Sequence, residues 1–149
     1  MGQYYLIVNL DKKQFLHPHK CGDGLKLLEF GCSANGTLTA LAILLADGNN
    51  RGGGDLHSEN PIIGSWAGDR IVIAGDYADE GKFTGDPTRT LYRVADEEFE
   101  DISRRALRAM TDDCYLAEEM KKTTTCQGEH SQSVYDYAMS GLPLLHLIK

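Results

Sequence analysis

Two short segments carry residue types that bind zinc. His17, His19 and Cys21 alternate along the chain, and alternate residues of an extended strand share one face. Cys126 and His130 form a second pair, so two ligands from each segment would complete a four-coordinate zinc site. Short His-x-His spacings also arise by chance. We therefore favour histidines at the solvent edge of the sheet and expect no bound metal or cofactor, with zinc as the alternative.

A second group of candidates surrounds an apolar, β-branched run at residues 70–74, which predicts a buried strand. Polar residues at the end of such a strand often form sites. Asp76 follows Gly75 directly, so we expect its carboxylate at the sheet edge. The predicted ligand-binding residues are Trp66, Asp69, Asp76, Tyr77, Asp79 and Arg51. The simpler alternatives are an acidic surface turn in which Asp76 caps backbone amides, and a Trp66 that only anchors the core.

Arg51 opens a loop that continues as Gly52-Gly53-Gly54, whose amides could bind an anion. No Gly-Lys-Ser/Thr follows, so it is not a Walker loop, and a plain surface loop is the favoured interpretation. The chain has no Gly-x-Ser-x-Gly elbow, and a catalytic triad is unsupported.

The elements that must position these residues follow from periodicity. Residues 3–10 and 15–19 predict a hairpin, which Pro18 ends or places at the sheet edge. An apolar stretch predicts a buried central helix at about 36–47, and i, i+3, i+4 spacing predicts an amphipathic helix at about 96–111. Residues 90–94 are a strand candidate. Residues 25–30 and 113–126 stay undecided between strand, helix and loop. Together these indicate one α+β domain over 1–149 with a small, mostly antiparallel sheet.

The net charge of the chain limits the kinds of partner that we expect. The chain has 149 residues, with 15 Lys and Arg against 22 Asp and Glu, for a net charge of −7. This balance argues against duplex nucleic acid and suits a basic partner. The arginines of the second helix, Arg104, Arg105 and Arg108, are expected to form a solvated face that pairs with acidic residues four positions earlier. The longest apolar run, 38–46, is too short to cross a membrane.

Several blocks resemble an uncharacterised family of small bacterial and phage proteins. They are the opening MGQYY, the stretch GLKLLEF, and the pair WAGD and GDYAD. No activity is established for that family, so the resemblance supplies no catalytic residues. It implies a cytoplasmic protein carried by a mobile element, and the absence of a basic segment before an apolar one at the start also favours the cytoplasm.

Two functions fit these observations. The first is a small soluble intracellular binding protein for a polar small ligand or a protein partner, with a phage accessory or counter-defence inhibitor as one setting. The alternative is a hydrolase of a phosphate ester or nucleotide, with His17 or His19 as base or metal ligand and Asp76 as acidic partner. The sequence does not decide whether the chain is an enzyme, nor its oligomeric state.

Overall fold

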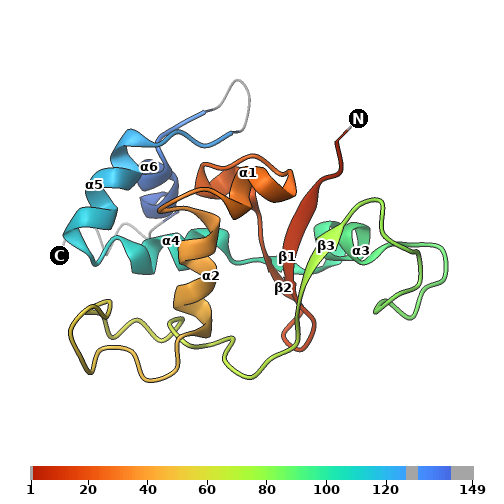
Figure 1. Cartoon of the computed structure of the whole chain (residues 1–149), viewed down its shortest axis with the longest axis horizontal. Helices are drawn as coiled ribbons and strands as arrows, with labels where there is room; N and C mark the ends of the chain where they lie inside the picture. The colour runs from red at the N-terminus through yellow and green to blue at the C-terminus, as the bar shows by residue number, and fades with distance from the viewer. Residues whose placement is uncertain (1, 127–130, 142–149) are drawn as a thin grey trace.

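In the computed structural model, which describes residues 2–126 and 131–141, four short strands form one mixed sheet (Figure 1). They are β1 (Tyr5–Asn9), β2 (Gln14–Leu16), β3 (Ile71–Gly75) and β4 (Glu100–Asp101), in the order β3-β1-β2-β4. β1 pairs antiparallel with β2 and β3, while β2 pairs parallel with β4. The expected α+β class is confirmed.

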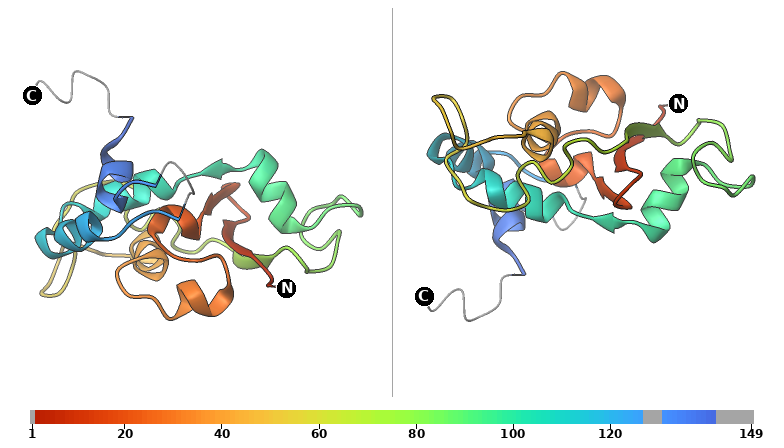
Figure 2. Two further views of the ribbon diagram at one scale, coloured as in Figure 1. Left: turned by 90° about the horizontal axis from the view of Figure 1, so that it is seen from above. Right: turned by 90° about the horizontal axis from the view of Figure 1, so that it is seen from below.

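β1 is buried on both faces because helices cover both sides of the sheet. Leu6 and Val8 pack with Leu91 of α3 (Leu91–Glu98), while Ile7 points to the opposite face and joins the larger cluster around Trp66. Figure 2 shows α3 on one side of the sheet and α2 (Thr37–Leu45) on the other. Because both faces are covered, the strand is apolar at successive positions rather than alternate ones.

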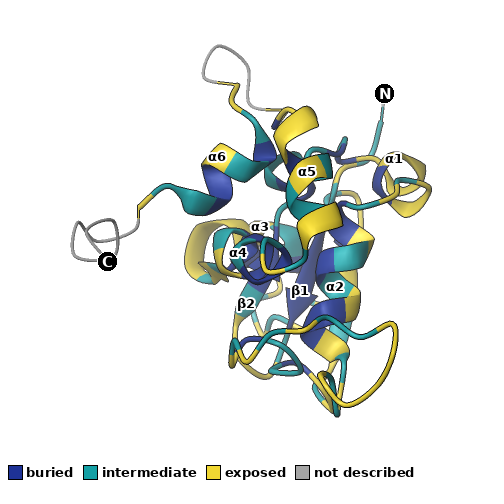
Figure 3. Cartoon of the chain, turned by 90° about the vertical axis from the view of Figure 1, so that its left-hand side faces the viewer, coloured by how far each residue is buried: buried dark blue, intermediate teal, exposed yellow. Residues whose placement is uncertain are grey.

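α2 is the helix expected at 36–47. The Asp23 carboxylate lies in the place of an N-cap side chain: its Oδ2 accepts from the Thr37 N–H at 2.8 Å and from Thr37 Oγ1 at 2.6 Å. Leu44 is fully buried in the core. Leu38 and Leu45 are 36% and 39% exposed, so the helix is covered on one side and open on the other (Figure 3).

The single helix expected at 96–111 is wrong, because the chain forms α3, then β4, then α4 (Ser103–Met110). The break has a tertiary cause. The Glu100 N–H donates to the Lys13 carbonyl at 3.0 Å, and the Ile102 N–H donates to the Phe15 carbonyl at 3.0 Å. These bonds to the β2 segment hold the linker extended, although the apolar side chains keep a helical spacing across it.

Other segments have a secondary structure that differs from the prediction or that the sequence left undecided. Residues 90–94 are not a strand, because Thr90 caps α3 by accepting from the Arg93 N–H. The chain after β2 does not stay extended, since Pro18–Cys21 form a 3-10 helix, η1. The undecided segments are helical in part: α1 (Leu27–Gly31) overlaps the first and α5 (Cys114–Lys122) lies within the second, near the end of which Thr124 forms a β-bridge with Ser133; α6 (Val134–Met139) follows.

The arginines of α4 form the expected solvated face only at Arg105, which is exposed and pairs with Glu100; Arg104 and Arg108 bind backbone carbonyls instead. The Arg104 Nε donates to the Tyr137 carbonyl at 3.1 Å, and Arg108 donates to the carbonyls of Ala138 and Ser140, each at 3.1 Å. These carbonyls lie at the C-terminal end of α6, so α4 caps α6. The expected i, i+4 ion pairs do not form because their acidic partners lie in β4 rather than in a helix.

Candidate functional site

The residues that follow β3 are fixed against the start of the chain. The Asp76 N–H donates to the Tyr4 carbonyl at 2.9 Å, and the Tyr4 N–H donates to Asp76 Oδ1 at 2.9 Å. The Tyr77 N–H donates to Gln3 Oε1 at 3.2 Å. Gly75 permits this approach, because a Cβ there would lie 2.1 Å from Gln3 Oε1. We call residues 75–77 the β3 lip.

A hollow of about 440 Å³ opens beside the β3 lip, and we call it the Asp76 hollow. Acidic and basic side chains line it, including Asp76, Glu80, Asp96, Arg89 and Arg93. The two arginines already have acidic partners. Arg89 forms ion pairs with Asp86, Glu97 and Glu98, and Arg93 pairs with Glu97.

The carboxylates of the Asp76 hollow are less committed. Within the described part of the chain, Asp76, Glu80 and Asp96 make no ion pair. Burial, and then the charges of Asp96 and Asp76, raise the pKa of the Tyr92 phenol, which also lines the hollow. The hollow is therefore negative. The described residues contain no group of three or more His, Cys, Asp or Glu placed to hold a metal ion.

β3 also presents an open edge. In an antiparallel ladder, successive residues turn their backbone groups alternately toward and away from the partner strand. The bonds that flank the ladder, Leu10 N–H to Arg70 carbonyl and Asp76 N–H to Tyr4 carbonyl, place the even-numbered residues of β3 against β1. Ile71 and Ile73 therefore direct their N–H and C=O groups outward. No described strand pairs there, since β3 is the first strand in the sheet order.

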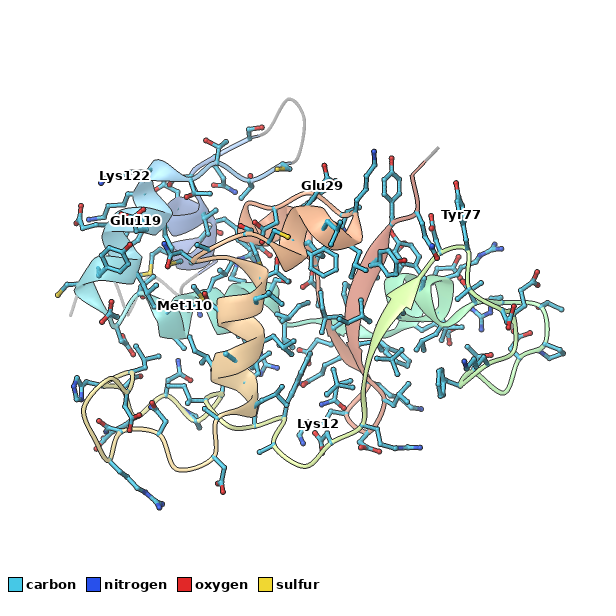
Figure 4. The ribbon with its side chains drawn as sticks, in the orientation of Figure 1. Lys12, Glu29, Tyr77, Met110, Glu119 and Lys122 are labelled. Atoms are coloured by element: carbon cyan, nitrogen blue, oxygen red, sulfur yellow. The ribbon has the colours of Figure 1, made fainter. Side chains whose placement is uncertain are left out.

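The remaining predicted ligand-binding residues do not gather at the lip. Trp66 is fully buried and donates its Nε1–H to a glutamine oxygen of β2 at 2.9 Å, so it is part of the core. Asp69 lies at the other end of β3, where it accepts from Lys12 Nζ at 2.6 Å; Figure 4 places Lys12 at the opposite end of the sheet from Tyr77. Arg51 is exposed in the α2–β3 connection. Of the predicted set, only Tyr77 and Asp79 stay near Asp76, and both are exposed.

The two histidines do not combine with Asp76. No hydrogen bond between described residues joins His17 or His19 to Asp76, and neither lines the Asp76 hollow. Burial lowers the pKa of His17 to about 4, so its imidazole is neutral at pH 7 and is a weak base. Its Nδ1 is buried without a hydrogen-bond partner in the described structure.

The zinc candidates come together only in part. The Cys126 N–H donates to the His19 carbonyl at 3.0 Å, so the two segments do meet. The 3-10 helix removes the shared strand face, and burial raises the pKa of the Cys21 thiol to about 12, which disfavours the thiolate that binds metal. His130 lies outside the described residues.

Sequence patterns alone missed Gln3 and Tyr4, which hold the lip, and Ile73, whose backbone groups face the open edge and which is 42% exposed. Gly75 directly before Asp76 was the one available sign of a close approach. Comparison with known proteins found no matching family model, curated protein or solved structure. No helix in the described part of the chain has the length and apolar character needed to span a membrane.

Proposed function

We propose that this chain is a binding protein that receives an extended, basic segment of a protein partner along the open edge of β3. One observation carries the proposal: an unpaired strand edge leads directly into a fixed, negatively charged lip and hollow. Addition of a strand to an exposed sheet edge is a recurrent mode of peptide recognition, in which main-chain hydrogen bonds supply affinity and side-chain pockets supply specificity.

Each part of the site has a role in this binding. The outward N–H and C=O groups of Ile71 and Ile73 bond the backbone of the incoming segment. The exposed side chains of Ile73 and Tyr77 supply apolar contact. A lysine or arginine of the partner enters the Asp76 hollow, where the unpaired carboxylates of Asp76 and Asp96 attract it.

Charge gives the preference for a basic partner. The chain carries −7 overall, and the Arg70 cation at the other end of β3 is neutralised by Asp11, whose Oδ1 lies 2.8 Å from Arg70 Nη2. A partner strand therefore meets its strongest field at the Asp76 end. Complementary potentials of this kind raise association rates and discriminate between partners.

The biological setting stays a prediction. A small acidic protein in the cytoplasm that captures a basic segment would suit a phage or mobile-element inhibitor of a nucleic-acid-binding enzyme, whose channel is basic. The hydrolase alternative needs a histidine within reach of Asp76, and the distribution of hydrogen bonds and hollows gives it no support. A small polar cation in the Asp76 hollow is the second candidate, and it would not need the edge of β3.

The test is an NMR titration of the isotope-labelled chain with a synthetic peptide of alternating lysine and valine. We expect the amide signals of Ile71, Ile73 and Gly75 to shift, and a matched glutamate–valine peptide to leave them unchanged. Ile73→Pro removes an outward N–H without touching the ladder to β1 and should abolish the shifts, whereas Ile73→Val keeps the N–H and should preserve them.

Charge is tested separately. Asp76→Asn keeps an oxygen that accepts from the Tyr4 N–H but loses the negative charge. It should therefore lower the affinity for the lysine peptide about tenfold. Shifts confined to the Asp76 hollow and unaffected by Ile73→Pro would favour the small cation. No shifts with any peptide, or equal shifts with the glutamate peptide, would refute the proposal.

A further inference from the structure

A second hollow, of about 410 Å³, lies at the end of the sheet away from the β3 lip. Three separate parts of the chain form it: the β1–β2 turn, the connection before β3, and α4. The polar residues that line it are Lys12, Gln14, Asn60, Ser65, Arg105 and Arg108. We call this the basic hollow.

The charged residues that line the basic hollow are basic, whereas the chain as a whole is acidic. The chain has more acidic than basic residues, 22 against 15, yet three cations and no carboxylate are among the described residues that line the hollow. A concave site lined by charges of one sign concentrates the field and attracts ions of the opposite sign. A solvated surface of this acidic chain would be expected to mix both signs.

Each of the three cations has a partner in the described structure. Lys12 Nζ lies 2.6 Å from Asp69 Oδ2, and Arg105 Nη2 lies 3.3 Å from Glu100 Oε1. Arg108 uses its Nε and Nη2 on the carbonyls that end α6, which fixes its guanidinium. Each anchor uses only part of the donor capacity of its cation, since an ammonium has three donors and a guanidinium has five.

Neutral donors and an apolar wall complete the site. The Asn60 Oδ1 accepts from the Ile62 N–H at 3.0 Å, so the Asn60 amide NH₂ faces away from that bond. The Ser65 hydroxyl also lines the hollow, and Pro61 and Ile62 add apolar surface. The volume falls within the range of small-molecule sites, roughly 300–1,000 Å³, and exceeds what one phosphate ion fills.

We infer that the basic hollow binds a small organic phosphate, with the phosphate on Lys12 and Arg105 and the organic part against Pro61 and Ile62. Guanidinium groups match phosphate oxygens in a two-pronged geometry, and an ammonium adds a point charge. This site is separate from the open edge of β3, so neither proposal depends on the other.

Calorimetric titration tests the inference with four probes: inorganic phosphate, adenosine 5′-monophosphate, uncharged adenosine and a short single-stranded oligonucleotide. We expect the monophosphate to bind more tightly than inorganic phosphate, and adenosine not to bind. Arg105→Gln and Lys12→Gln should each lower the affinity for the monophosphate by about tenfold or more. This is the loss expected for one charge-assisted hydrogen bond. Circular dichroism verifies that both variants remain folded.

Lys122→Gln is the matched control, because Lys122 is an exposed helical lysine that pairs with Glu119 and lines neither of the two hollows described above. It should leave the affinity for the monophosphate unchanged. Equal loss with Lys122→Gln would show a general charge effect and overturn the site. Absence of binding by both phosphates at millimolar concentration, or equal binding of adenosine, would overturn it as well. Tighter binding of a single-stranded oligonucleotide than of the monophosphate would replace the small ligand with a nucleic acid.

Discussion

Proline substitutions one residue apart in β3 are expected to differ in cost because adjacent N–H groups point in opposite directions. The Val72 N–H faces β1 and pairs with Val8, which is fully buried. Val72→Pro removes that ladder bond, which contributes about 1 kcal/mol net, and leaves a buried carbonyl without a donor, which costs about 1–3 kcal/mol. The expected loss in the free energy of unfolding is about 2–4 kcal/mol.

Ile73→Pro removes an N–H that faces outward, so no ladder bond is lost. Ile73 is 42% exposed, and the replacement of its side chain removes only part of an apolar contact. The expected cost is about 1 kcal/mol. Proline is tolerated at sheet edges for this reason.

Urea unfolding, followed by the fluorescence of the buried Trp66, measures both costs. Val72→Ala and Ile73→Ala serve as controls that remove the side chains but keep both N–H groups, so their costs are subtracted. After this subtraction, the cost of Val72→Pro should exceed that of Ile73→Pro by about 2–4 kcal/mol. Equal costs, or a larger cost for Ile73→Pro, would refute the register and with it the open edge.

Three further predictions concern buried or anchoring groups. Burial lowers the pKa of His17 from 6.5 to about 4, so the unfolded chain binds a proton at higher pH than the folded chain does; stability should fall by roughly 3 kcal/mol as pH drops from about 6.5 to 4, and His17→Gln should flatten that part of the urea-midpoint profile. Arg108→Ala should cost about 1–3 kcal/mol and speed amide exchange in α6, because the carbonyls that end this helix lose their donors; unchanged exchange would contradict the capping role. Cys21 should react with a thiol reagent only in denaturant, whereas the exposed Cys32 and Cys114 should react in the native chain, because burial raises the Cys21 pKa to about 12; equal native rates would contradict its placement.

Local patterns predicted the elements that tertiary contacts reinforce. The apolar run before Asn9 and the β-branched run before Gly75 become β1 and β3, because helices cover both faces of the sheet. The prediction of a continuous helix across Phe99–Ile102 was wrong because tertiary contacts there oppose the local pattern. The side chains of this segment fit a helix, but two backbone bonds to the β2 segment hold it extended, and a pairing between segments about 86 residues apart leaves no local pattern.

The parts of the candidate site that depend on local sequence were the easiest to select. Asp76 was selected because a polar residue directly after a buried strand is visible in the sequence, and in the structure Asp76 lines a hollow. The alternation of His17 and His19 suggested a strand face, but Pro18 begins a 3-10 helix there, a turn in which its missing N–H costs little. The open edge depends on the order of strands, which periodicity does not specify.

The net charge of the chain gives no indication of the basic hollow. The physical reason is that acidic residues pair with two of the cations that line it. Asp69 and Glu100 count against a phosphate site in any sum over the sequence, yet each pairs with a cation that lines the hollow and favours one position of that cation. An acidic residue that orients a lysine or arginine lowers the entropy that the cation loses on binding, while it cancels only part of the local field. A balance of −7 describes the chain as a whole and therefore does not exclude a small anion site. Because Lys12 and Arg105 lie 93 positions apart in the chain, only the fold that brings the β1–β2 turn to α4 creates that site.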